Sequence, residues 1–137
     1  MIEPAALSRL ALFADLSPPE LAAVAQVMDE ASFARDALAL RAGVTGNAFY
    51  VITEGEAVVL IDGTARANLC PGDYFGEVGI FTGEATGADV AASSEELRCA
   101  ALPGAELRRL LLEYPQVGIR MLEVGARRLR AANLWAG

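Results

Sequence analysis

Apolar and polar positions repeat with a helical period in the first part of the chain. Ser17 is followed three residues later by Glu20, and two prolines stand between them. A serine and a glutamate at this spacing form a capping box, and proline suits the first turn of a helix. The pattern predicts a helix at about 18–30. A short helix on the same core is predicted by four earlier apolar residues, Leu7, Leu10, Leu12 and Phe13. Residues 1–32 are therefore expected to form an N-terminal helical segment.

From Phe33 the period shortens to that of β-strands. Asp62-Gly63 stands between two β-like runs and is a strong hairpin signal. Further turns are expected at 43–47 and at Pro71-Gly72. The segment 33–102 is therefore predicted to hold about eight short strands, with the most evident runs at 37–40, 48–52, 56–61, 64–69, 88–93 and 97–102.

The helical period returns at Pro103. Leucines on one face predict a helix at 103–113, which Tyr114-Pro115 ends. A longer helix is expected at 116–134, so residues 103–137 form a C-terminal helical segment. The order of elements predicts one domain, 1–137, that is mainly β with flanking helices. Its expected core is a double-stranded β-helix, a jelly-roll-like β-roll, with N-terminal helices and two C-terminal helices.

Composition excludes several kinds of chemistry. The 137 residues include no histidine and no lysine, so histidine triads, histidine-based metal sites and Schiff-base catalysis are excluded. We therefore expect no catalytic residues, no metal site and no enzymatic activity. Eleven basic against 18 acidic residues give a net charge of −7, which argues against direct contact with nucleic acid.

The expected location is the cytoplasm. The N-terminus does not resemble a signal peptide, and no apolar run is long enough to cross a membrane. Cys70 and Cys99 form no metal-binding pair, and we expect two reduced, partly buried thiols.

The segment with the most chemical content begins at Pro71 and reads PGDYFGEVGIF. It combines a turn, a glycine-rich bend and the start of a short helix, and a helix N-terminus binds phosphate well. Glycines at Gly76 and Gly79 would let a ligand approach the backbone. Glu77 could accept hydrogen bonds from a sugar hydroxyl. The competing interpretation is a glycine-rich corner of the roll, with Glu77 only stabilising the helix.

These residues carry a resemblance to a known family. Leu12-Phe13, Tyr50-Val51, Gly55 and the run PGDYFGE at 71–77 resemble the cyclic nucleotide-binding domain. This is the module of catabolite-activator-type regulators, kinase regulatory subunits and gated channels. The resemblance covers the chain from about residue 12 to residue 130.

The resemblance implies a phosphate-binding cassette at 75–90. In the family, the glutamate that matches Glu77 holds the ribose 2′-hydroxyl, and amides of a short helix, here about 78–80, hold the cyclic phosphate. The last helix, at 116–134, closes over the purine as a lid. The implied ligand is cyclic AMP or cyclic GMP, or a related small anion. The implied binding residues are Gly76, Glu77, Val78, Gly79, Thr86, Gly87 and Ala88.

The chain departs from the family at one decisive place. Members that bind cyclic nucleotide usually carry Pro-Arg late in the cassette, and here Ala85 and Thr86 stand there. Asp89 replaces a small hydroxyl residue. A hydrogen bond to a charged group contributes roughly 1.5–3 kcal/mol, so its loss implies binding about tenfold to over a hundredfold weaker. Arg66 or Arg98 could supply the missing charge.

Two functions therefore remain open. The first is a ligand sensor, with weakened or altered binding, that signals through its C-terminal helix. The second is a degenerate module that no longer binds cyclic nucleotide and acts through protein contacts, as a partner or homodimer, by its helices. Trp135 either caps the purine or packs on the core. The arginines at 127–130 either contact an acidic partner or form a solvated helix end.

Overall fold

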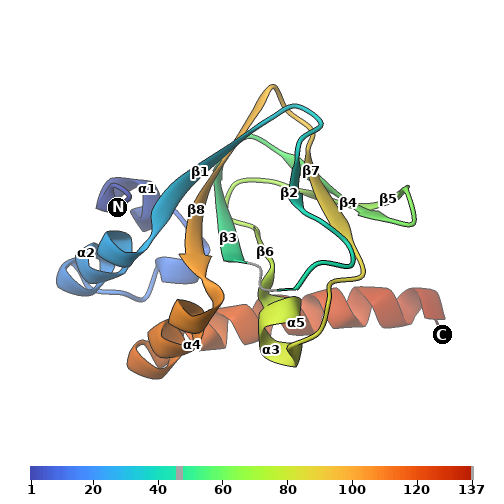
Figure 1. The fold of residues 1–137 in the computed structure, drawn as a ribbon. Helices are drawn as coiled ribbons and strands as arrows, with labels where there is room; N and C mark the ends of the chain where they lie inside the picture. The colour runs from blue at the N-terminus through green and yellow to red at the C-terminus, as the bar shows by residue number, and fades with distance from the viewer. Residues whose placement is uncertain (46–47, 137) are drawn as a thin grey trace.

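The computed structural model describes residues 1–45 and 48–136, which form a roll of two antiparallel sheets (Figure 1). Each sheet has four strands, in the orders β1-β8-β3-β6 and β2-β7-β4-β5. This confirms the predicted β-roll with flanking helices. The strands are β1 (Asp29–Ala34), β2 (Leu38–Leu40), β3 (Ala48–Glu54), β4 (Ala57–Ile61), β5 (Thr64–Leu69), β6 (Tyr74–Phe75), β7 (Asp89–Ala92) and β8 (Glu96–Pro103).

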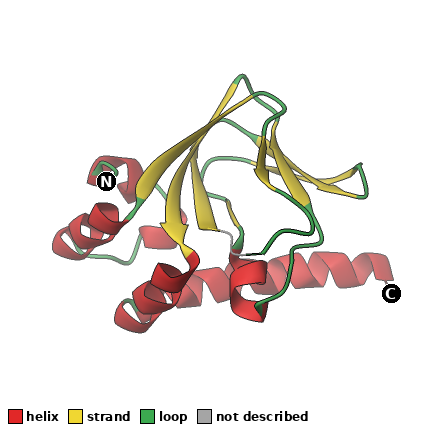
Figure 2. Ribbon diagram, in the orientation of Figure 1, coloured by secondary structure: helices red, strands yellow, loops and turns green. Residues whose placement is uncertain are grey.

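Helices cover one side of the roll and run beneath it (Figure 2). The capping box is present: the Glu20 amide donates to Ser17 Oγ at 3.4 Å, and the Ser17 amide donates to Glu20 Oε1 at 2.8 Å. The helices are α1 (Pro4–Ser8), the 3₁₀ turn η1 (Ala11–Phe13), α2 (Pro18–Val27), α3 (Glu77–Thr82), α4 (Gly104–Glu113) and α5 (Pro115–Ala136).

The first strand begins earlier than the sequence pattern indicates. Helix α2 ends at Val27, and β1 starts at Asp29 and pairs with β8 along its whole length. The strand reads DEASFA, and its outward residues are exposed. It lies at the edge of its sheet, so it carries little of the apolar alternation that marks strands in sequence.

Two apolar clusters lie on opposite sides of the sheet that contains β3 and β8. One includes helix residues and packs the helices on this sheet. The other joins residues of both sheets and fills the roll. On the short strand β6, Tyr74 belongs to the first cluster and Phe75 to the second. Because neighbouring strand residues point to opposite faces, β6 connects the helix layer with the inside of the roll.

Local turn chemistry agrees with the sequence. Asp62 and Gly63 join β4 to β5 with φ angles of 51° and 75°, as the positive-φ hairpin turn requires.

Cys99 is buried, which raises its pKa to about 12. Cys70 is exposed, so the expectation of a partly buried thiol is wrong at this position. Both cysteines are free.

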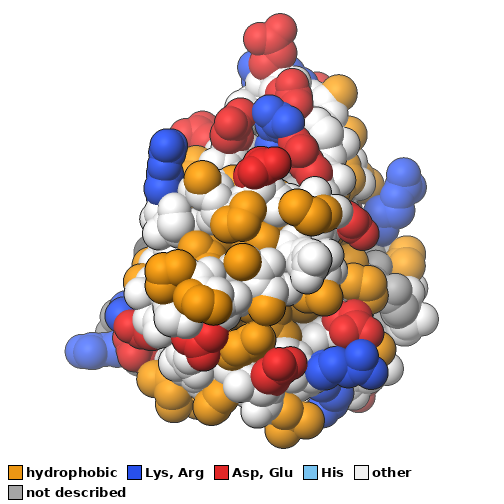
Figure 3. Space-filling model, turned by 90° about the vertical axis from the view of Figure 1, so that its left-hand side faces the viewer, with side chains coloured by type: hydrophobic (Ala, Val, Ile, Leu, Met, Phe, Trp, Pro, Cys, Tyr) orange, Lys and Arg blue, Asp and Glu red, His pale blue; other side chains and the backbone are white. Residues whose placement is uncertain are grey.

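The surface is mixed in charge. On the face that carries the N-terminal helices, hydrophobic side chains gather across the middle and basic side chains are scattered among acidic ones (Figure 3). Within the described ranges 1–45 and 48–136, no helix is both long and apolar enough to cross a membrane.

Candidate functional site

The candidate site is built on the corner where β6 turns into α3. Gly76 is the N-cap of α3 and has a φ of 95°. A Cβ atom added there would lie 2.3 Å from the carbonyl oxygen of Ala48 on β3. The chain therefore passes the β3 backbone at a distance that only glycine allows, with a backbone conformation that glycine adopts without strain.

Glu77 occupies the first turn of α3, directly after this corner. Its side chain is 16% exposed. Burial raises the pKa of its carboxyl group, and hydrogen bonds from the amides of Glu77 and Val78, together with Arg128, offset part of that effect. The carboxylate is thus a largely buried acceptor at the positive end of a short helix.

Arg128 of α5 reaches this corner from 51 residues further along the chain. Its Nη2 donates to the carbonyl oxygen of Tyr74 at 2.8 Å, and its Nη1 lies 3.4 Å from Glu77 Oε2. Its guanidinium also stands 4.4 Å from the centroid of the Tyr74 ring. Sequence reasoning missed this residue, because it assigned the arginines at 127–130 either to an acidic partner or to a solvated helix end.

Thr86 lies inside the cassette loop and is only 8% exposed. Its hydroxyl donates to the carbonyl oxygens of Arg41 at 3.1 Å and Ala88 at 3.4 Å. Its own carbonyl accepts from the Gly43 amide at 2.8 Å. The hydroxyl proton is therefore engaged with backbone acceptors, and Thr86 ties the cassette to the loop after β2.

The remaining predicted residues differ in their surroundings. A Cβ on Gly79 would lie 3.1 Å from Thr86 Cγ2, so the missing side chain lets the loop pack on α3. A Cβ on Gly87 would have no heavy atom within 4 Å. The Val78 side chain is 62% exposed, and the Val78 amide donates to the Glu77 carboxylate. The structure brings Gly76, Glu77, Val78 and Gly79 together at one corner of the roll, with Thr86 against Gly79.

Other charged residues near the predicted phosphate position have partners elsewhere. Asp89 accepts a hydrogen bond from the Ala42 amide at 2.7 Å, so one of its oxygens is occupied by backbone. Arg98 lies on β8 and pairs with Glu30, Glu54 and Glu96. Arg98 is therefore committed to other carboxylates and is not free to replace the missing cassette arginine. Arg66 lies exposed on β5. The side chain of Trp135 lies outside the described part of the structure.

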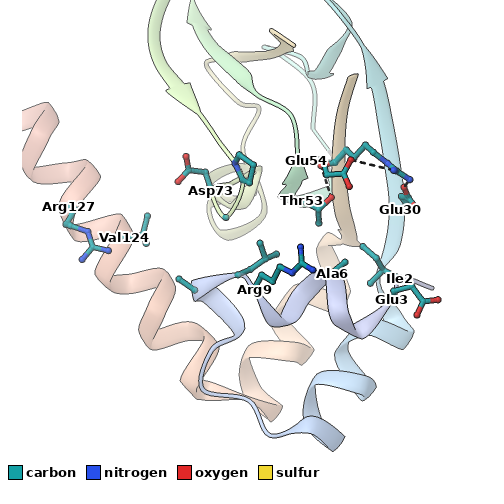
Figure 4. A pocket seen from close by; sticks show the side chains of 15 residues that line it. Ile2, Glu3, Ala6, Arg9, Glu30, Thr53, Glu54, Asp73, Val124 and Arg127 are labelled. Atoms are coloured by element: carbon teal, nitrogen blue, oxygen red, sulfur yellow. Dashed lines mark hydrogen bonds and ion pairs between the residues drawn. The ribbon is translucent and has the colours of Figure 1, made fainter. Parts of the chain in front are cut away.

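A cavity of about 790 Å³ lies beside the turn that precedes β6 (Figure 4). It opens between α1, α5 and the turn before β6, and its lining includes Arg9, Asp73 and Arg127. None of the seven predicted binding residues lines it.

Among residues 1–45 and 48–136, no cluster of three or more histidine, cysteine, aspartate or glutamate side chains is arranged to hold a metal ion.

Comparison with known proteins agrees with this fold, a β-roll with flanking helices. The family model described as the cyclic nucleotide-binding domain matches residues 30–114, which is more than half of the chain. The chain belongs to the cyclic nucleotide-binding domain family. This confirms the resemblance and makes the chain a cyclic nucleotide-binding regulatory domain.

One relative is a bacterial transcriptional regulator. The chain is 30% identical over 135 residues to the CRP-like cAMP-activated global transcriptional regulator of Mycobacterium tuberculosis. The match covers 93% of this chain and 58% of the regulator, so the chain spans less than two thirds of that relative.

Two solved structures are regulatory subunits of a cAMP-independent protein kinase A. The subunit from Trypanosoma cruzi is bound to guanosine; it is 26% identical, has a TM-score of 0.69, and the match covers 80% of this chain and 39% of that chain. The subunit from Trypanosoma brucei is a mutant with three substitutions, one of them threonine to arginine, bound to cAMP in its A site. It is 26% identical with a TM-score of 0.70, and the match covers 80% and 40% of the two chains.

Proposed function

We propose that this domain binds a cyclic nucleotide at the corner between β6 and α3, with low affinity. In this proposal the Glu77 carboxylate accepts the ribose hydroxyl, and the amides of Gly79 and Ile80 hold the phosphate. The observation that carries the proposal is the buried Glu77 carboxylate at the start of α3, in a turn that only Gly76 allows. A buried acceptor of this kind binds a donor such as a hydroxyl well.

The low affinity follows from the residue at position 86. An arginine there would give a charge-assisted bond to the phosphate, whereas Thr86 uses its hydroxyl on the Arg41 carbonyl. The trypanosomal relatives are consistent with this argument, since a cAMP-independent subunit holds guanosine and a triple mutant of another, with threonine-to-arginine among its three substitutions, holds cAMP. A nucleoside without a phosphate is therefore a second ligand to test.

The proposed role is regulatory and not enzymatic. Ligand occupancy would be reported by α5, which contacts the corner through Arg128. Such a report requires that the ligand bind one arrangement of the helix more tightly than another. Two free thiols suit a location in the cytoplasm, where cysteines stay reduced.

Isothermal titration calorimetry with cyclic AMP, cyclic GMP and guanosine tests the proposal. We expect binding of at least one cyclic nucleotide with a dissociation constant of roughly 10 μM to 1 mM, which is about 4–7 kcal/mol of binding free energy. No heat with either cyclic nucleotide at several millimolar would contradict the proposal. Binding of guanosine alone would replace the proposed ligand by a nucleoside.

The second candidate function is self-association through α5. Ile119, Leu122 and Leu129 are 56%, 69% and 63% exposed and follow one another at intervals of three and seven residues. This spacing places them on one stripe of the helix, as in the seam of a coiled coil. A second copy of the chain would cover that stripe.

Sedimentation equilibrium measures this association. We expect a concentration-dependent dimer that Leu122→Glu converts to a monomer, because a charge would be buried in the seam. Leu112→Glu is the matched control, since Leu112 is 85% exposed but lies on α4. A wild-type monomer at all concentrations, or equal effects of both substitutions, would refute the dimer.

A further inference from the structure

The loop that follows β2 is attached to the cassette loop by hydrogen bonds. The Thr86 hydroxyl donates to the Arg41 carbonyl oxygen at 3.1 Å, and the Gly43 amide donates to the Thr86 carbonyl oxygen at 2.8 Å. The Ala42 amide donates to the Asp89 carboxylate at 2.7 Å. The two segments run side by side near α3 (Figure 1). The backbone of Arg41 is therefore held against the position at which the family usually has its arginine.

Thr86 lies between Arg41 and α3. A Cβ atom added at Gly79 would lie 3.1 Å from Thr86 Cγ2, so the Thr86 methyl group packs beside Gly79 while its hydroxyl bonds to Arg41. The amides of Gly79 and Ile80 are the groups proposed above to hold the phosphate. The backbone of Arg41 is thus separated from the proposed phosphate position by one small side chain.

The side chain of Arg41 is exposed. Within residues 1–45 and 48–136, no hydrogen bond, ion pair or aromatic contact engages its guanidinium. It can therefore change rotamer toward a ligand without losing an interaction, as side chains at binding sites commonly do. A guanidinium remains charged at neutral pH, and its planar set of donors matches the oxygens of a phosphate.

Asp89 increases the need for a positive charge at this place. Its carboxylate accepts the Ala42 amide, and no arginine of the described part of the chain pairs with it. A carboxylate beside a bound phosphate repels it, since the two negative charges interact over a few ångströms. Arg41 is the neighbour of Ala42 in the chain, so it stands where a cation would offset this repulsion.

The other arginines considered for this role are placed less favourably. Arg98 is held by three glutamates. Arg108 of α4 stands 5.9 Å from the centroid of the Phe81 ring, near the C-terminal end of α3 and away from its first amides. Arg66 lies on β5, which pairs with β4 at the edge of its sheet. Arg41 is the arginine whose backbone the structure attaches directly to Thr86.

We propose that Arg41 supplies the positive charge that the cassette lacks, by pairing with the phosphate of a bound cyclic nucleotide. The inference rests on the proposed function. The phosphate of such a ligand is a diester with a single negative charge, so one guanidinium neutralises it. The contact is made from an exposed loop, where solvent weakens an ion pair. It therefore contributes less affinity than an arginine at the buried position 86.

Calorimetry with Arg41→Gln and Arg41→Lys tests the proposal. Glutamine removes the charge, so we expect cyclic AMP to bind roughly three- to tenfold more weakly than to the wild type. The salt dependence of binding should also decrease, because one ionic contact is lost. Lysine keeps the charge, so Arg41→Lys should bind more tightly than Arg41→Gln. Arg109→Gln is the matched control, since the Arg109 side chain is 75% exposed on α4, and it should leave the affinity unchanged.

Nuclear magnetic resonance gives a second readout on the wild-type protein. The Nε–Hε signal of Arg41 in ¹⁵N-labelled protein, assigned by its absence in Arg41→Gln, should shift when cyclic AMP is added. The same signal should stay in place with guanosine, which carries no phosphate. A purely structural role of Arg41 in the loop would not produce this difference between the two ligands.

Several results would overturn the role of Arg41 while cyclic AMP still binds the wild type. They are an unchanged affinity in Arg41→Gln, equal weakening in Arg41→Gln and Arg41→Lys, and an Arg41 signal that does not shift at saturation. A loss of affinity in Arg66→Gln but not in Arg41→Gln would assign the charge to β5 instead. If neither cyclic nucleotide binds the wild type, the proposed function fails, and the role of Arg41 fails with it.

Discussion

Replacing Gly76 with alanine should destabilise the domain and remove ligand binding. The added Cβ would meet the Ala48 carbonyl oxygen at 2.3 Å. Ala48 is held in β3 by pairing with β8, and Gly76 directly follows β6, which pairs with β3. Alanine also resists a φ of 95°. We expect a loss of roughly 2 kcal/mol or more in the free energy of unfolding, or about 5–10 °C in the melting temperature. Urea unfolding and calorimetric titration measure the two effects.

Gly83→Ala is the matched control for this substitution. Gly83 ends the same short helix and has a φ of 72°, but a Cβ there would meet no heavy atom within 4 Å. It therefore carries the conformational cost without the collision, and we expect a loss of roughly 1 kcal/mol and retained binding. Equal losses for the two variants would show that the close approach of Gly76 to β3 is not important.

Replacing Thr86 with arginine should strengthen cyclic nucleotide binding. The new guanidinium would pair with the ligand phosphate, and a charge-assisted bond of this kind contributes roughly 1.5–3 kcal/mol, or about a tenfold to hundredfold gain in affinity. The gain should shrink as salt is raised, because an ionic contact is screened. Guanosine carries no phosphate, so its affinity should not rise. Calorimetry at two salt concentrations measures all three effects.

Thr82→Arg is the control for the added charge. Thr82 is an exposed threonine of α3, and it bonds to the Val78 carbonyl at 2.8 Å. The substitution Thr82→Arg introduces the same side chain into the cassette but away from the phosphate position, so we expect little change in the affinity for cyclic nucleotide. Thr86→Val reports the cost of losing the bond to the Arg41 carbonyl. If Thr86→Arg folds and binds no better than the wild type, position 86 does not explain the weak affinity.

Local signals made much of the fold predictable. The Ser17–Glu20 capping box and the Asp62-Gly63 turn act within a few residues, so their chemistry can be read directly from the sequence. The same holds for the glycine-rich corner, since Gly76 and Glu77 are neighbours in the chain. The strand β1 could not be predicted in this way, because its pairing with β8, about 70 residues away, decides its conformation.

The site was harder to predict because its partners are distant in sequence. Arg128 meets Glu77 across 51 residues, and the Thr86 hydroxyl meets the Arg41 carbonyl across 45. No local pattern marks either contact. The sequence suggested Arg98 as a substitute for the cassette arginine, whereas three glutamates occupy it in the folded domain. The resemblance indicated which residues to consider, and the folded chain determines what each of them contacts.

The most direct test of the account is a nuclear magnetic resonance titration of ¹⁵N-labelled protein with cyclic AMP. The account predicts saturable chemical-shift changes that are largest for the amides of residues 76–80. These changes should vanish in Glu77→Ala, while the rest of the variant's spectrum remains that of a folded protein. Shifts centred elsewhere, for example on the cavity lined by Arg9 and Arg127, would contradict it. An unchanged response in Glu77→Ala would contradict it equally.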